Sequence, residues 1–97
     1  MSNQEILKTD NVSVRVMVLA EGASTEWHYH TNVADFFVCL SGTVKVETKN
    51  PDEEVILLPG QRTEIKPPKI HRVLNTNNDK SDYLLVQGIG PYDFIKV

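Results

Sequence analysis

The sequence is poor in cysteine, since Cys39 is the one thiol among 97 residues. A single cysteine excludes an intramolecular disulfide framework and fits a reducing compartment. Long hydrophobic runs are missing as well, and the apolar stretches present are far too short to span a bilayer. The first ten residues, MSNQEILKTD, lack the basic start and apolar core of a signal peptide. We therefore expect a soluble, cytoplasmic protein without a membrane partner.

An excess of positive charge is also missing. Ten lysines and arginines stand against thirteen aspartates and glutamates, which gives a formal net charge of -3 at pH 7. Proteins that bind nucleic acids usually carry a basic field, so the charge argues against nucleic acid as a partner. The length predicts one domain over residues 1–97. So small a domain buries a modest share of its surface, and bound metal or dimerisation would add stability.

A sustained helical period of 3.6 residues is absent, and short β-rich runs between turn signals take its place. In residues 12–20, VSVRVMVLA, valines recur at every second position and share one face of a strand. Many short strands at regular spacing predict an all-β sandwich or barrel. The expected strands cover residues 12–20, 26–30, 35–40, 43–48, 53–58, 61–65, 70–75 and 83–87, and the tail 92–97 could add an edge strand.

Alternation assigns faces to the segment EWHYHTNVADFFVCL. His28 and His30 share one face of their strand, and Asp35, Phe37 and Cys39 share one face of the next. The other faces carry four apolar side chains that also need a cover, namely Trp27, Tyr29, Phe36 and Val38. Either the N-terminal strand of the chain or a partner subunit would supply it, because a monomer rarely exposes a large apolar patch.

Three histidines occur in the chain, His28, His30 and His71. Imidazole nitrogen is the commonest protein ligand for zinc, copper, iron and nickel. Two histidines at i and i+2 of a strand project into the same space. A third histidine from a distant strand and one carboxylate would complete a set that leaves coordination positions open. A His-x-His pair on a strand is by itself weak evidence for such a site.

The spacing around these histidines is more specific. Gly22, His28, His30, Asp35 and Gly42 form a first group, and a second group consists of Gly60, His71 and Asn75. This two-part pattern resembles the signature of the cupin superfamily, which are small jelly-roll β-barrels. The resemblance covers residues 22–42 and 60–75 directly. It implies that His28, His30 and His71 are metal ligands and that Asp35 takes the place of the acidic ligand.

Three positions depart from the family pattern. The acid is usually glutamate, and the shorter Asp35 either reaches the metal directly or acts through a water or another ligand. Lys66 stands where proline is usual, and Pro68 stands where glycine is usual. The proline pair at 67–68 can still form a stiff turn. The alternative to a metal site is a metal-free cupin whose histidines line a polar pocket.

The resemblance leaves two classes of function open, because a fold does not choose a reaction. The first is a metal-dependent enzyme of oxygenase, isomerase or lyase type that acts on a small organic acid, sugar or phenolic compound. Its divalent metal would be iron, zinc, nickel or manganese, with a bound water or Asp35 as the base. The second is a non-catalytic module that binds or senses a small ligand or metal. In either class we expect a homodimer.

Several other residues have weaker expectations. Cys39, Phe37 and Val73 should face inward, with Cys39 as a small core residue rather than a reactive thiol. The facing of YLLVQ at 83–87 is left open, so either Tyr83 or Gln87 could line the pocket. Three cations close to His71 could attract an anionic substrate, although a solvated loop is the simpler interpretation. These are Lys66, Lys69 and Arg72.

Overall fold

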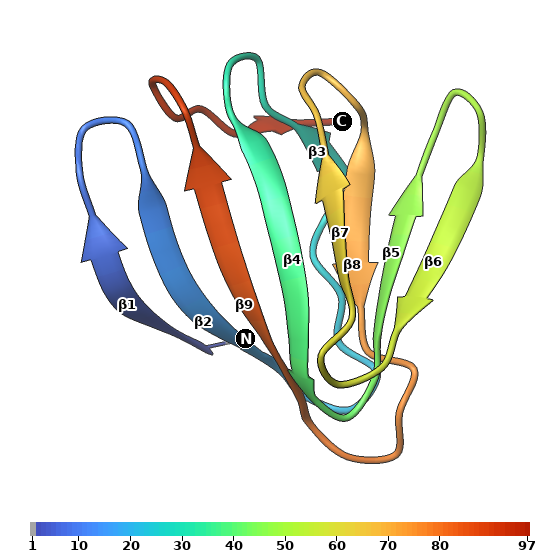
Figure 1. Ribbon diagram of the computed structural model, residues 1–97. Helices are drawn as coiled ribbons and strands as arrows, with labels where there is room; N and C mark the ends of the chain where they lie inside the picture. Colours follow the sequence, from blue (N-terminus) through green and yellow to red (C-terminus); the bar gives the residue numbers. More distant parts are fainter. Residues whose placement is uncertain (1) are drawn as a thin grey trace.

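A computed structural model describes residues 2–97 and arranges them as ten β-strands in two antiparallel five-stranded sheets (Figure 1). The first sheet has the order β1 (Ser2–Lys8), β2 (Ser13–Leu19), β9 (Ser81–Gly88), β4 (Ala34–Ser41) and β7 (Arg62–Ile65). The second has the order β10 (Ile95–Lys96), β3 (His28–Tyr29), β8 (His71–Leu74), β5 (Val44–Thr48) and β6 (Glu53–Leu57). Among residues 2–97, no helix is long and apolar enough to cross a membrane.

The architecture confirms the predicted all-β jelly roll. Strands that are neighbours in space are mostly distant in sequence, as β2, β9 and β4 are in the first sheet. Each expected strand is present, but β3 and β10 are only two residues long. None of the strand ranges predicted from alternation covers β1, because SNQEILK lacks regular alternation. It pairs with β2 through a register shift between Glu5 and Leu7.

The core lies between the two sheets and follows from the alternation of each strand. In β9 the side chains of Tyr83, Leu85 and Gln87 point inward, which assigns the facing that the sequence left open. Phe37, Cys39 and Val73 are buried as expected. The apolar core consists of Met17, Leu19, Phe37, Cys39, Val44, Val46, Leu57, Ile65, Val73, Tyr83 and Leu85.

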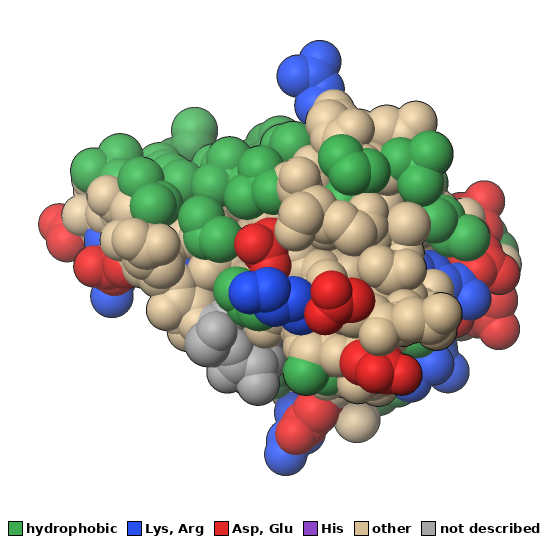
Figure 2. All heavy atoms as spheres, turned by 90° about the horizontal axis from the view of Figure 1, so that it is seen from below, with side chains coloured by type: hydrophobic (Ala, Val, Ile, Leu, Met, Phe, Trp, Pro, Cys, Tyr) green, Lys and Arg blue, Asp and Glu red, His purple; other side chains and the backbone are tan. Residues whose placement is uncertain are grey.

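The valine face of β2 is the outer one, since Met17 and Leu19 are the buried residues of this strand. The register aligns Val14 with Val86 and Phe36 across three strands, and Val16 with Leu84 and Val38 in the next row. These six residues form an apolar outer face on the first sheet. Figure 2 shows hydrophobic side chains gathered on the side where Figure 1 places β1, β2, β9 and β4.

The four apolar side chains expected to form one outer face lie on two different sheets. Tyr29 belongs to the second sheet and Trp27 directly precedes its strand β3, whereas Phe36 and Val38 belong to the first sheet. The prediction of a shared cover for them was wrong, because the loop at 31–33 carries the chain from one sheet to the other. The N-terminal strand β1 hydrogen-bonds to the edge of β2 and extends the first sheet rather than covering β4.

The outer face of the second sheet is charged. The Trp27 ring lies between two cations, with Lys49 Nζ 4.6 Å and Arg72 Cζ 4.7 Å from its centroid. Glu47 accepts a hydrogen bond of 2.6 Å from Arg72 and lies 3.5 Å from Lys45. Such pairs keep this face solvated and contrast with the apolar face of the first sheet.

Asn75 holds the loops at one end of the sandwich together. Its buried side-chain amide donates to the carbonyls of Leu19 and Asp79, and its oxygen accepts from Ser81 Oγ. Gly42 lies close by with φ +69°, and a Cβ at this position would collide with Ser81 Oγ. Both residues belong to the spacing pattern of the sequence, and the structure gives them a role in the fold.

Candidate metal centre

Three of the four candidate ligands lie in three different strands, the fourth directly follows β3, and all four meet inside the sandwich. His28 in β3 pairs directly with His71 in β8, and His30 follows two residues later on the same face. Asp35 enters from β4 in the opposite sheet. One potential ligand atom from each residue lies within 4.8 Å of the others, and all four residues are buried. The sequence-predicted set is therefore brought together without exception.

Backbone carbonyls fix the orientation of all three imidazoles. The Nδ1–H groups of His28, His30 and His71 donate to the carbonyls of Glu26, Asp93 and Lys69, at 2.7, 2.6 and 2.8 Å. This assigns the Nδ1–H tautomer to each neutral ring. The three Nε2 atoms are left with free lone pairs that point toward the same volume. Metal-binding histidines are typically held by such a hydrogen bond from the other ring nitrogen.

The Asp35 carboxylate lies among these nitrogens. Its Oδ2 atom is 2.8 Å from His71 Nε2 and 3.1 Å from His30 Nε2, and its Oδ1 atom accepts a hydrogen bond of 2.9 Å from Gln87 Nε2. In the neutral tautomers, Nε2 and Oδ2 are both acceptors, so a proton or a metal cation has to stand between them. Three imidazole nitrogens and one carboxylate oxygen are a donor set suited to a divalent transition metal.

The charges of the cluster follow from its burial and contacts. Burial raises the pKa of Asp35, but hydrogen bonds from His30 and His71 outweigh it and hold that pKa well below its usual range. Burial lowers the pKa of His30, but the hydrogen bond and charge of Asp35 together raise it above its usual value. Burial and the two other imidazoles lower the pKa of His28. The cluster therefore holds a carboxylate anion that attracts one cation, either a proton or a metal.

The C-terminal tail completes one side of the site, which sequence analysis did not anticipate. The Phe94 ring stacks on His28 with centroids 4.2 Å apart, and the Tyr92 ring lies 5.4 Å from His30. The Asp93 carboxylate accepts hydrogen bonds from the backbone N–H and hydroxyl of Thr31. The tail thus places two exposed aromatic side chains beside the histidines. Nothing in the spacing of residues 92–94 signals a contact with residues more than 60 positions away.

Gln87 also contributes to the site, and the sequence left its role open. It faces Asp35 directly in the β4–β9 register. Its amide nitrogen donates to Asp35, while its oxygen accepts from Arg15 on the inner face of β2. A chain of polar contacts therefore leads from Arg15 through Gln87 to the Asp35 carboxylate.

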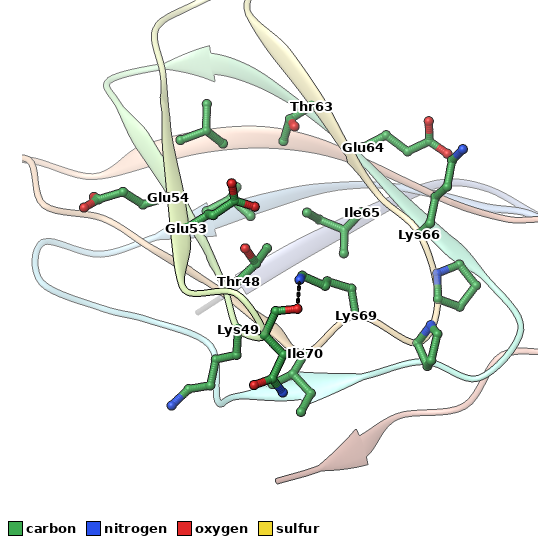
Figure 3. A pocket seen from close by; sticks show the side chains of 15 residues that line it. Thr48, Lys49, Glu53, Glu54, Thr63, Glu64, Ile65, Lys66, Lys69 and Ile70 are labelled. Carbon is green, nitrogen blue, oxygen red and sulfur yellow. Dashed lines mark hydrogen bonds between the residues drawn. The ribbon is translucent and has the colours of Figure 1, made fainter.

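The cations near His71 in sequence do not converge on the site. Arg72 points to the outer face, because adjacent residues of β8 alternate. Lys66 and Lys69 line an open pocket of about 820 Å³ bordered by β6, β7 and the proline loop, and Lys69 donates to the Asn50 carbonyl at 2.8 Å (Figure 3). None of the four candidate ligands lines this pocket. Cys39 is a buried core thiol whose pKa is raised by burial, which fits the expected structural role.

Comparison with known proteins agrees with this geometry. Among solved structures, a Klebsiella pneumoniae protein with a double-stranded β-helix domain superposes with a TM-score of 0.86 at 21% identity, covering 99% of this chain and 83% of that one. An oxalate oxidase matches at TM-score 0.81 and 15% identity over 90% of this chain and 46% of that one, so this chain spans less than half its length. A sugar phosphate isomerase of the cupin superfamily from Silicibacter pomeroyi matches with a TM-score of 0.71 at 16% identity, covering 89% of this chain and 68% of that one.

These identities are low, so the likeness to solved structures shows the fold alone. No curated protein matches the chain. The family model described as "Cupin domain" matches residues 15–87, which contain all four candidate ligands. The chain therefore belongs to the cupin domain family.

Proposed function

We propose that this protein is a metal-dependent enzyme that acts on a small organic acid, sugar or phenolic compound. The observation that carries the proposal is the convergence of three oriented Nε2 atoms on a buried carboxylate. His28, His30 and His71 would hold the metal through Nε2, and Asp35 would supply the oxygen ligand. A divalent iron, zinc, nickel or manganese ion with open positions polarises a bound oxygen or, if redox-active, binds dioxygen.

We assign Asp35 to ligation rather than to proton transfer. Both of its oxygens are engaged inside the cluster, Oδ2 with two imidazoles and Oδ1 with Gln87. A general base needs a lone pair within reach of the proton that it removes. A bound water is therefore the better candidate for the general base. Phe94 and Tyr92 would limit the entry of bulk water and offer flat apolar surfaces to the substrate.

The similar structures support catalysis only by analogy of fold, since they include an oxalate oxidase and a sugar phosphate isomerase. The alternative function is a non-catalytic cupin that binds a metal or small ligand. No observation favours this binding module over the enzyme, because both functions need an open metal site. The two functions differ in whether a bound compound is converted.

The test is turnover by the metal-loaded protein. Samples reconstituted separately with iron(II), zinc, nickel or manganese are incubated with small acids, sugars and phenols, while oxygen uptake and product NMR spectra are recorded. The enzyme account expects conversion that requires one of these metals and disappears in His71→Ala. Ligand binding without conversion by any loaded sample would instead establish the binding module.

We further propose that a second copy of this chain covers the apolar outer face of the first sheet. Phe36 on β4 is 39% exposed, and the other five residues of this face are aliphatic. β7 borders this face with Arg62 and Glu64, which lie beside Val38 and Phe36. A two-fold axis across the strands would place Arg62 of each copy against Glu64 of the other, so the edge is self-complementary. The second sheet, with its paired charges, offers no comparable apolar face.

A cytoplasmic location is also part of the proposal. Cys39 is a free, buried thiol that forms no disulfide. Proteins of oxidising compartments more often use their cysteines in disulfides, so the thiol supports a reducing compartment.

A further inference from the structure

A second cavity lies next to the metal cluster, between the β1–β2 hairpin and the C-terminal tail. Its volume is about 170 Å³, and its walls include Arg15, Val33, Gln87 and Tyr92. Since a water molecule occupies roughly 30 Å³ of liquid, this volume suits a ligand of a few heavy atoms. None of the four candidate ligands lines the cavity directly.

Arg15 is incompletely satisfied in this cavity. It projects from the inner face of β2, where one terminal nitrogen donates to Gln87 Oε1. Its Nε atom is buried and has no hydrogen-bond partner among the described residues. A buried guanidinium N–H without an acceptor is unfavourable, so an acceptor bound in this cavity would stabilise Arg15. Glu5 lies opposite Arg15 in the β1–β2 register, yet residues 2–97 form no ion pair with this guanidinium.

Two side chains link this cavity to the cluster. Gln87 lines the cavity with its oxygen toward Arg15 and donates its amide N–H to Asp35 Oδ1. Tyr92 also lines the cavity, and its ring lies 5.4 Å from that of His30. A small molecule held by Arg15 would therefore sit on the side of Gln87 and Tyr92 that faces away from the histidines, and Gln87 would link it to Asp35.

We propose that Arg15 binds the carboxylate of a small organic acid in this cavity, where Gln87 links the bound acid to the neighbouring metal site. This inference goes beyond the proposed function, because the acid would bind outside the cluster of candidate ligands. A guanidinium presents parallel N–H donors that match a carboxylate, and Nε is the free member of such a pair. The other charged walls are Lys8, Glu5 and Asp10, so the four charged walls, with Arg15, sum to a formal charge of zero. Without a net positive charge, the cavity favours a small monocarboxylate over a dianion.

The test observes Arg15 itself in metal-free protein. Arginine-labelled protein is titrated with glycolate while the Nε–H signals of its three arginines are recorded by NMR. Arg15→Lys identifies the signal, and Arg72→Lys serves as the matched control because Arg72 lies on the opposite outer face. We expect glycolate to shift the Arg15 signal saturably, with a Kd on the order of 1 mM. Neutral glycolamide should leave it in place, and Arg15→Lys should weaken glycolate binding about tenfold or more.

Inorganic phosphate separates a carboxylate site from a general anion site. Binding of phosphate as tight as that of glycolate would overturn the carboxylate assignment, and an Arg15 signal unmoved by glycolate would overturn the inference altogether. Metal content is measured in parallel. If the wild type bound no metal but glycolate still shifted Arg15, the metal-dependent function would fail while the anion site stood. If Arg15→Lys kept its metal and lost glycolate binding, both would be supported.

Discussion

His71 Nε2 lies 2.8 Å from Asp35 Oδ2, although the two residues are 36 positions apart and belong to opposite sheets. The His71 ring is oriented by the Lys69 carbonyl, so its Nε2 atom is an acceptor in the neutral tautomer. An acceptor held against a carboxylate oxygen requires a cation between them or a proton on the ring. This contact is the structural basis of the metal site that we propose.

Replacing His71 by alanine should abolish stable metal binding. The substitution removes one of three nitrogen ligands. Loss of a residue that only hydrogen-bonds to a ligand lowers metal affinity by roughly 10–100-fold, and loss of a ligand should lower the affinity for zinc by more than that. Competition with a chelating dye measures this directly. Lys69→Ala is the matched control, since only the backbone carbonyl of Lys69 contacts His71. Equal zinc affinity in His71→Ala and the wild type would refute the ligand assignment.

Gln87→Leu should weaken metal binding without removing a ligand. The substitution takes away the N–H that Asp35 Oδ1 accepts, so the carboxylate loses part of its orientation. We expect zinc affinity to fall by about 10–100-fold. Isothermal titration with zinc measures the change. An unaltered affinity would mean that Asp35 is held without Gln87, or that it is not a ligand.

Asn75→Ala should destabilise the fold while leaving the metal site intact. The buried amide satisfies the carbonyls of Leu19 and Asp79, and these would lose their donor. Unsatisfied buried groups cost about 1–3 kcal/mol each, so the free energy of unfolding should fall by about 2–4 kcal/mol. Urea denaturation of metal-free protein gives this value. Asn75→Ala should lower stability alone, whereas Gln87→Leu should lower metal affinity. A loss of zinc affinity in folded Asn75→Ala would contradict this prediction.

The stabilisation by metal should grow as pH rises. The raised pKa of His30 means that protonated His30 stabilises the metal-free fold below the unfolded pKa of about 6.5, and that this contribution is lost as pH rises through the folded pKa. Protons also compete with metal for Nε2. The difference in Tm with and without zinc should thus be larger at about pH 8 than at about pH 5.5. A difference that is the same at both values would argue that zinc binds away from the histidines.

Val38→Glu should convert a dimer to a monomer, because it places a charge on the apolar face. Sedimentation velocity measures the state of assembly. Trp27→Glu is the matched control: its side chain lies on the second sheet between Lys49 and Arg72, so its replacement should leave the dimer intact. A wild type that is monomeric at micromolar concentrations, or a Val38→Glu variant that remains dimeric, would contradict the proposed interface.

Local alternation and motif spacing predicted much of this structure. The two-residue spacing of His28 and His30 places both on one face, and the same rule turns Asp35, Phe37 and Cys39 inward. Alternation could not say which face of β2 is buried, because valines occupy one side and Met17 and Leu19 the other. Alternation also could not predict that Trp27 and Phe36 lie on different sheets, since this depends on where the chain crosses from one sheet to the other.

The contacts of the chain ends were beyond local rules. β1 has weak alternation, and its place is set by pairing with β2. Tyr92 and Phe94 reach the histidines because the tail returns to pair with β3, where Lys96 faces His28. Alternation says nothing about the partner of Arg15, and only the β2–β9 register brings it to Gln87. Each of these contacts is long-range and depends on the assembled fold.

We propose that His28, His30, Asp35 and His71 hold a metal ion, and elemental analysis checks this. The protein is purified without an affinity tag or chelator, and the metal content is expressed per chain. We expect about one divalent transition-metal ion per chain, present on purification or restored by adding metal. A ratio near zero that added iron, zinc, nickel or manganese cannot raise would contradict it, and would mean that the histidines line a metal-free polar pocket.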